Sequence, residues 1–172
     1  ETGQPGIAVG STDNDAGELS YGGSVPASRF NRLKMRKVVP GDTPQPAVTM
    51  NGNCVLVPRA VYERIGLLDA VYRHAMGDND YGFRAHKAGI PIRVMPGYAG
   101  RCNNDNRVSG SFNDPALPLR ARWRKIISPK GLPLDSWRAL CSRHAGPVWP
   151  LVWLLPYARL VLGAAARRPP AR

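Results

Sequence analysis

Residues 76–89 constrain the fold more than any other stretch, because they combine a helix start, a helix face and a helix stop. Asp78 and Asp80 come just after a glycine, and carboxylates are stabilised by the free N–H groups of a first helical turn. Apolar residues then recur at the spacing of one helical face: Tyr81, Ala85 and Ala88. Gly89 offers the C-terminal stop, so the stretch predicts a single helix.

Asp78 admits two interpretations that the spacing does not separate. In the simpler one, its carboxylate stabilises the N-terminus of the helix. In the other, it lies at the mouth of a cleft and acts as a general base toward a bound hydroxyl. Asp80 is expected to be mainly structural, because it can pair with Arg84 one turn later or accept backbone N–H groups.

The other elements are predicted from strand-forming runs, turn residues and prolines. Strands are expected over three stretches, the middle one buried on both faces: residues 7–9, 54–57 and 90–95. Pro96-Gly97 should end the last strand, and residues 18–23 should form the return arm of a hairpin. Helices are expected over residues 58–65, 117–127 and 136–144. Asp135 can cap the last helix and Gly146 can stop it.

The net charge of +12 is concentrated in the last third of the chain. Residues 1–116 hold 13 Lys/Arg and 11 Asp/Glu, a net of +2, whereas residues 117–172 hold 11 Lys/Arg and one acid, a net of +10. With 43% apolar residues, we expect a globular body over residues 1–116 and a basic helical tail over residues 117–172. Such a bias attracts anionic surfaces, either nucleic acid or lipid.

The aromatic residues of the tail favour a lipid surface. Trp149, Trp153 and Tyr157 are four apart and would share one helical face at the headgroup level, a pattern typical of in-plane membrane contact. Flanking arginines could contact anionic lipid: Arg143, Arg167 and Arg168. Arg159 and three prolines interrupt the apolar run, so a full crossing is not expected. The alternative is that these rings form an ordinary core, and nucleic acid is the third choice because the rings lie in an aliphatic run.

Basic and metal-binding patterns elsewhere are weaker. Residues 29–37 hold five basic residues in nine, either a solvated strand face or a rim that meets a phosphate-bearing acceptor. Asp13-Asn14-Asp15 fits an Asp-x-Asp metal motif, but turn residues follow, so a turn between two strands is expected. Three widely spaced cysteines suit a reducing compartment: Cys54, Cys102 and Cys141. Cys102 is expected to be a small buried hydrophobe rather than a metal ligand.

Three motifs carry a resemblance to a known family: Asn51-Gly52-Asn53-Cys54-Val55-Leu56-Val57-Pro58-Arg59, Gly66-Leu67-Leu68-Asp69, and Gly77-Asp78-Asn79-Asp80 with Arg84 and Gly89. As a set they resemble the second half of a family 2 glycosyltransferase, closest to its bacterial rhamnosyltransferase-like members. By position, Asp78 matches the family's catalytic base and Asp80 its second acidic residue. Gly77 stands where the family more often has Glu.

The resemblance covers nearly all 172 residues and implies an α/β fold, the acceptor-side half of a Rossmann-like GT-A domain followed by a helical tail. It further implies an N-terminal nucleotide-binding half that would mainly hold a divalent metal, Mg or Mn, and the donor diphosphate. Asn51, Gly52 and Asn53 would then line the acceptor pocket, since a glycine lets backbone approach closely, although a plain turn is an equal alternative. Asp80 and Arg84 are further candidates for acceptor contact, although Arg84 could equally tie its helix to the sheet.

The implied function is inverting sugar transfer from a nucleotide-sugar donor to a cell-envelope or lipid-linked saccharide acceptor, with this chain inactive alone. The expected location is the cytoplasmic face of the cell membrane, as a peripheral protein on an anionic surface, without nucleic acid as partner. The alternative is a non-catalytic saccharide-binding or membrane-docking module. A basic nucleic-acid binder is the third hypothesis.

Overall fold

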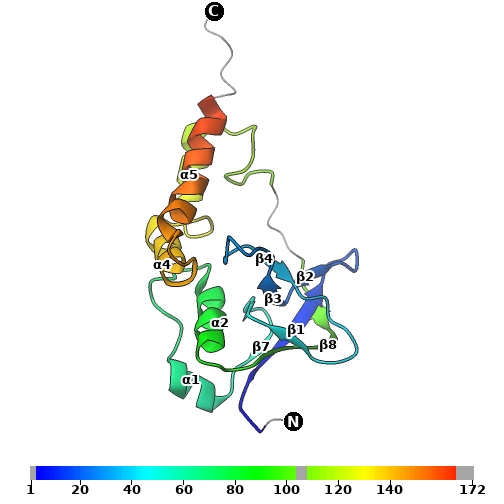
Figure 1. Ribbon diagram of the computed structural model, residues 1–172. Coiled ribbons are helices and arrows are strands. Elements are labelled where there is room, and N and C mark those ends of the chain that lie inside the picture. Colours follow the sequence, from blue (N-terminus) through cyan, green and yellow to red (C-terminus); the bar gives the residue numbers. More distant parts are fainter. Residues whose placement is uncertain (1–2, 104–107, 166–172) are drawn as a thin grey trace, which may run out of the picture. The chain divides into compact units, whose positions relative to one another are not determined.

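The computed structural model describes residues 3–103 and 108–165, and these form two compact units. Unit 1 comprises residues 1–72 and 76–105, and unit 2 comprises residues 73–75 and 106–172. Unit 1 is a curled mixed sheet with helices, and unit 2 is helical, so the expected mixed α/β class is confirmed (Figure 1). The prediction of a body over residues 1–116 and a tail over residues 117–172 stays a prediction.

The main sheet of unit 1 is built around one central strand, β1 (Ile7–Asp13). It pairs in parallel with β8 (Ile92–Arg101) and antiparallel with two short strands, β2 (Leu19–Tyr21) and β7 (Val55–Leu56). An edge strand, β5 (Gln45–Ala47), pairs antiparallel with β8. The predicted strand at residues 7–9 and the hairpin return at residues 18–23 are therefore confirmed.

Two strand predictions need correction. β8 does not end at Pro96-Gly97 but runs to Arg101, because the irregularity there is absorbed as a register shift: Val9 pairs with Val94 and Ser11 with Tyr98. Gly97 has a φ of 65°, which a glycine adopts readily at a bulge. The run at residues 54–57 is not buried on both faces, since β7 is a two-residue strand whose Leu56 is 70% exposed.

A second, three-stranded sheet of β3 (Gly23–Pro26), β4 (Met35–Lys37) and β6 (Thr49–Met50) completes unit 1. Two helices, α1 (Arg59–Ile65) and α2 (Gly77–Lys87), contribute to the same core. That core contains apolar residues from the strands and both helices, among them Ile7, Val94, Val61 and Tyr81. α2 confirms the helix predicted within residues 76–89, and Gly89 follows it with a φ of 73°.

Glycine and proline set the ends of α1. Pro58 is the residue before the helix rather than its first residue, and Gly66 ends it with a φ of 78° while donating to the Tyr62 carbonyl. Residues 67–75 form no regular helix or strand and join α1 to α2. Unit 1 thus presents a helix–loop–helix segment in which the loop carries two exposed leucines, Leu67 and Leu68.

Unit 2 consists of α3 (Leu119–Ile126), α4 (Leu134–His144) and α5 (Trp149–Ala165). The first two confirm the helices predicted at residues 117–127 and 136–144. Asp135 is not the cap of α4, because Pro133 occupies that position, and the Asp135 carboxylate instead accepts the Ser136 N–H within the first turn. This hydrogen bond is the main reason that the pKa of Asp135 is lowered.

Part of the aromatic stripe of α5 packs inside unit 2, whereas Trp149 is half-buried and lies outside that core cluster. Tyr157 is buried between the rings of Trp123 and Trp153, with ring centroids 6.1 and 6.2 Å away. Its hydroxyl donates to the Leu132 carbonyl at 2.6 Å. Tyr157 therefore belongs to a core, as the alternative interpretation proposed, and Trp153 packs against that core half-buried, while contact of the tail with a membrane surface stays a prediction. Of the predicted flanking arginines, Arg167 and Arg168 lie outside the described residues.

The opposite face of α5 is apolar and exposed, and it includes Leu151, Leu154 and Leu162. Pro150 lies in the first helical turn, where its missing N–H costs little, while Pro156 lies inside the helix. Within residues 3–103 and 108–165, every helix is too short or too polar to cross a bilayer.

Candidate functional site

Asp78 lies in the first turn of α2, after a residue with an unusual backbone conformation. Met76 precedes the helix in the left-handed region, with a φ of 74°. This region is costly for a residue with a Cβ atom, and strained residues often border functional sites. The Met76 carbonyl nevertheless accepts the Asp80 N–H at 2.9 Å, so the helix hydrogen bonding begins at once.

The carboxylate of Asp78 is half-buried and joins α2 to the turn after β6. Its Oδ2 accepts the Gly52 N–H at 2.9 Å. Its Oδ1 accepts the backbone and side-chain N–H groups of Asn79, at 2.8 and 2.9 Å. The simpler interpretation, stabilisation of the helix N-terminus, therefore has direct support. These bonds also fix the orientation of the carboxylate.

Asp80, two residues later, has no exposed surface. Its Oδ2 accepts the Arg84 Nε–H at 2.8 Å, and its Oδ1 accepts the Tyr72 hydroxyl at 3.1 Å. A buried carboxylate is stable only when it is paired and hydrogen-bonded, as here. The expected pairing with Arg84 is confirmed, whereas the expected contact of Asp80 with an acceptor is corrected, because burial withholds its oxygens from any ligand.

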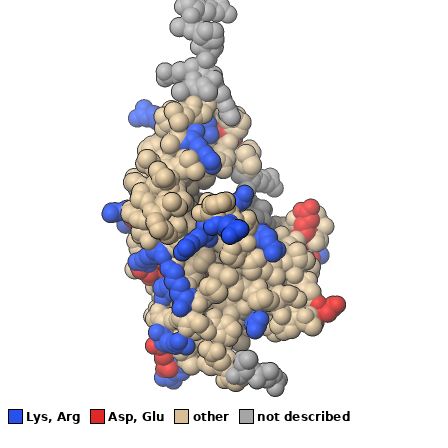
Figure 2. Space-filling view, viewed as in Figure 1, with Lys and Arg blue, Asp and Glu red and all other residues tan. Residues whose placement is uncertain are grey.

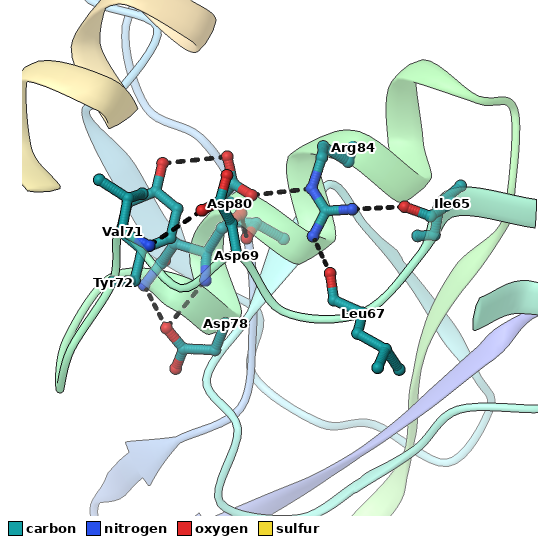
Figure 3. A network of polar contacts seen from close by, with 10 residues as sticks. Ile65, Leu67, Asp69, Val71, Tyr72, Asp78, Asp80 and Arg84 are labelled. Atoms are coloured by element: carbon teal, nitrogen blue, oxygen red, sulfur yellow. Dashed lines mark hydrogen bonds and ion pairs between the residues drawn. The ribbon is translucent and has the colours of Figure 1, made fainter.

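Arg84 uses its guanidinium to hold the chain around it. Figure 3 shows it between Asp80 and two carbonyls, that of Ile65 at the end of α1 and that of Leu67 in the connection that follows, at 2.6 and 2.8 Å. It also lies 5.0 Å from the ring centroid of Tyr81. Burial raises the pKa of Tyr81, and the Arg84 charge partly opposes that rise. Arg84 thus has a structural role here, and its contact with an acceptor stays a prediction.

A pocket of about 280 Å³ opens beside Asp78, within unit 1. Its floor is formed by Met50 and Tyr81, and the connection after α1 contributes Leu67 and Leu68. Asp78 is the one ionisable carboxylate among the lining residues. A cleft beside Asp78 was expected, but its leucine wall was not predicted, because the two leucines lie in a loop, where apolar residues have no periodicity to reveal their common direction.

One residue of the predicted acceptor-lining turn, Gly52, lies at this pocket. Gly52 lines it and donates to Asp78, as described above. Asn53 is exposed and its side chain reaches Cys102 Sγ at 3.7 Å, while the Asn51 backbone N–H donates to the Gly22 carbonyl. The turn itself is confirmed, and contact with an acceptor stays a prediction.

The described residues do not fit a divalent metal. No cluster of three or more His, Cys, Asp or Glu side chains exists within residues 3–103 and 108–165. Asp13-Asn14-Asp15 forms the predicted turn: the Asn14 side chain accepts the Glu18 N–H, and Asp13 lies 3.7 Å from Arg101. Cys102 is only partly buried, so the expectation of a buried hydrophobe is wrong for it.

Basic side chains gather over the β3–β4 hairpin (Figure 2). Four of the five basic residues in residues 29–37 are exposed: Arg29, Arg32, Lys34 and Arg36. The fifth, Lys37, donates to the Ser20 carbonyl and lies over the Tyr21 ring. These exposed cations agree with the interpretation of residues 29–37 as a solvated strand face, although only residues 35–37 belong to a strand. A role in phosphate contact stays a prediction.

No protein-family model, no curated protein sequence and no solved structure matches the chain.

Proposed function

We propose that this chain is the acceptor-side part of an inverting glycosyltransferase of the family 2, GT-A type, with Asp78 as the general base. The observation that carries the proposal is the position of Asp78: its half-buried carboxylate is fixed in orientation, and the residue borders an apolar pocket. A carboxylate offers about four acceptor positions. The three hydrogen bonds from Gly52 and Asn79 leave room for one from an acceptor hydroxyl.

The proposed reaction requires one proton acceptor and one leaving group. The hydroxyl oxygen of the acceptor attacks the anomeric carbon of the donor sugar from the face opposite the nucleotide diphosphate. The new carbon–oxygen bond forms as the bond to the phosphate oxygen breaks, and the hydroxyl proton passes to Asp78. A positioned general base of this kind contributes about 10²- to 10⁴-fold to the rate.

The proposal also names partners. The donor is a nucleotide sugar, held with its metal mainly by an N-terminal half that this chain would complete. The acceptor is a saccharide of the cell envelope or a lipid-linked saccharide, and the protein would act as a peripheral protein on the cytoplasmic face of an anionic membrane. In-frame coding sequence upstream that ends in an Asp-x-Asp motif would support this assignment, and an initiation codon just before Glu1 would contradict it.

The decisive experiment replaces Asp78 with Asn in the complete enzyme. Asn keeps one acceptor oxygen for the Gly52 N–H and lacks the basicity needed to take a proton. We expect sugar transfer to fall by about 10²- to 10⁴-fold while donor binding persists. The matched control is Asp42→Asn, an exposed acid of unit 1 remote in sequence from the pocket residues. Wild-type turnover in Asp78→Asn would refute the assignment.

A second candidate is a non-catalytic saccharide-binding or membrane-docking module. The hydrogen bonds of Asp78 favour it, because they give this carboxylate a complete structural role at the N-terminus of α2. In that case Asp78→Asn would change stability, and the sugar transfer of any associated enzyme would be unaffected.

A further inference from the structure

The pocket beside Asp78 has an apolar wall that is held in place although it is exposed to solvent. Leu67 is 74% exposed and Leu68 is 64% exposed, and both lie in the connection between α1 and α2. Adjacent exposed leucines are unfavourable in water, and apolar surface of this kind often marks a binding site. We therefore expect a bound molecule to cover these two leucines.

The buried network under the loop fixes the position of this wall. Arg84 donates to the Leu67 carbonyl at 2.8 Å, and Arg84 is itself paired with Asp80. On the other side of the loop, the Tyr72 hydroxyl donates to Asp80 (Figure 3). The connection is thus tied to α2 on both sides of Leu68. A wall that is already ordered loses little conformational entropy when a ligand binds.

The size and chemistry of the pocket define what fits. A volume of about 280 Å³ is at the lower limit of small-molecule pockets, so a protein helix would not enter it. Val55 and Val57 complete the lining from the strand side, and Met50 and Tyr81 form a buried floor. The surface of the pocket is apolar throughout: Asp78 borders it without offering a polar atom to it, and the other lining side chains are aliphatic or aromatic. A free sugar, with hydroxyls on every face, would leave most of its polar groups unpaired here.

We propose that this pocket binds the alkyl chain of an amphipathic acceptor, a molecule whose hydroxyl lies at Asp78 while the first methylenes of its chain lie between Leu68 and Tyr81. This inference rests on the proposed function for the role of the hydroxyl, and it narrows the acceptor to the lipid-linked class. The binding of the alkyl chain itself requires no catalysis.

The test uses alkyl β-D-glucopyranosides of increasing chain length, from methyl through butyl and hexyl to octyl, each below its micelle-forming concentration. The full chain is titrated with each compound, and backbone amide NMR signals are followed. We expect affinity to rise by about fourfold for each buried methylene, until the pocket is filled. The largest shifts should fall on Met50, Leu68 and Tyr81. Equal affinity for the methyl and octyl compounds would overturn the proposal.

A matched pair of variants locates the site. Leu68→Ser removes part of the wall, whereas Leu56→Ser changes a leucine that is also exposed, at 70%, and does not line the pocket. We expect the octyl compound to bind Leu68→Ser about tenfold more weakly and to bind Leu56→Ser as it binds the wild type. Equal losses in the two variants, or shifts on the exposed leucines of α5, would place the binding elsewhere and refute the inference.

The general-base role of Asp78 and the alkyl-binding pocket can be refuted independently of each other. If Asp78→Asn in the complete enzyme keeps full turnover while the chain-length dependence persists, the alkyl site stands and the base assignment is lost. If turnover falls but chain length has no effect on binding, the base assignment stands and the amphipathic acceptor is refuted.

Discussion

Unit 1 and unit 2 bury their polar groups in different ways. Unit 1 encloses a full negative charge, Asp80, and balances it with Arg84 and a tyrosine hydroxyl. Unit 2 encloses aromatic rings whose polar atoms donate to backbone carbonyls: Trp137 to Trp153, Trp153 to Leu134, and Tyr157 to Leu132. The first arrangement uses charge to hold a loop, and the second uses neutral hydrogen bonds to hold a packed core.

This difference indicates where function is expected. A buried ion pair is often no more stable than an apolar pair of similar size, so its retention calls for a reason other than stability. In unit 1 the pair fixes the connection that forms one wall of the pocket beside Asp78. In unit 2 the neutral hydrogen bonds need no such reason, because the buried rings supply stability themselves.

The largest expected effect follows from breaking the buried pair. Arg84→Met would leave Asp80 buried without its counter-charge and two carbonyls without their donor, so we expect a loss of about 3–5 kcal/mol in the stability of unit 1. Arg59→Met is the matched control, because Arg59 and Glu63 form a pair at the same i,i+4 spacing on the surface, with exposures of 80% and 53%. That variant should lose less than about 0.5 kcal/mol.

The measurement can separate the units because all four tryptophans lie in unit 2: Trp123, Trp137, Trp149 and Trp153. Tryptophan fluorescence during urea unfolding therefore follows unit 2, and amide hydrogen exchange follows unit 1. Arg84→Met should change the amide hydrogen exchange of unit 1 and leave the fluorescence transition of unit 2 unchanged. Identical shifts in both signals would mean that the units unfold as one, and the comparison between them would fail.

Alkaline pH should weaken unit 2. Burial raises the pKa of Cys141 and of Tyr157 to about 12, from ordinary values of 9.0 and 10.0. Both groups are neutral in both states well below about pH 9, so their effect on stability is absent there. As the pH rises from about 9 toward about 12, the unfolded chain ionises first and unfolding becomes more favourable. Each group contributes at most about 1.4 kcal/mol per pH unit.

Urea unfolding followed by tryptophan fluorescence at about pH 8 and about pH 11 measures this loss. Tyr157→Phe should reduce the difference between the two conditions, because one of the two ionising groups is gone. It should also be less stable at the lower pH, since the Leu132 carbonyl loses its donor. An unchanged pH dependence in this variant would show that Tyr157 ionises normally in the folded protein.

Two helical glycines give smaller and opposite effects. A Cβ atom at Gly82 in α2 would lie 2.7 Å from the Thr49 Cα, so Gly82→Ala should destabilise unit 1 by about 1–3 kcal/mol despite the better helix propensity of alanine. At Gly163 in α5, a Cβ would meet no described atom within 4 Å, and Gly163→Ala should stabilise unit 2 by about 0.5–1 kcal/mol. Amide hydrogen exchange reports the change in unit 1, and tryptophan fluorescence during urea unfolding reports the change in unit 2. Destabilisation by Gly163→Ala would reveal a neighbour for α5.

The sequence predicted local elements better than it predicted burial. The helix over residues 76–89, its Gly89 stop and the hairpin turn at Asp13-Asn14-Asp15 depend on nearby residues, and they are confirmed. The strand at residues 54–57 is less buried than predicted, because β-branched composition does not reveal whether a strand lies at an edge of the sheet. Pro96-Gly97 failed as a strand end because a bulge can absorb both residues.

The candidate site was predicted only in part for the same reason. Spacing indicated that Asp80 could reach Arg84, but only tertiary contacts decide that the pair is buried and that Asp78 is the carboxylate beside the pocket. In the tail, helical spacing placed Trp153 and Tyr157 on one face correctly. It could not tell whether that face meets lipid or protein, since both environments favour aromatic rings.

The exposed leucines of α5 give the smallest expected change in stability, and they test the predicted membrane partner. With the aromatic face buried, lipid contact would fall to Leu151, Leu154 and Leu162, which lie on one helical face. Changing all three to Ser should alter the stability of unit 2 by under about 0.5 kcal/mol each, because exposed side chains contribute little. It should reduce co-sedimentation with phosphatidylserine-containing vesicles, where apolar contact and the basic charge of the chain act together. Binding that persists in the variant but disappears in high salt would assign the attraction to charge alone, and the apolar face of α5 would then have no role at the membrane.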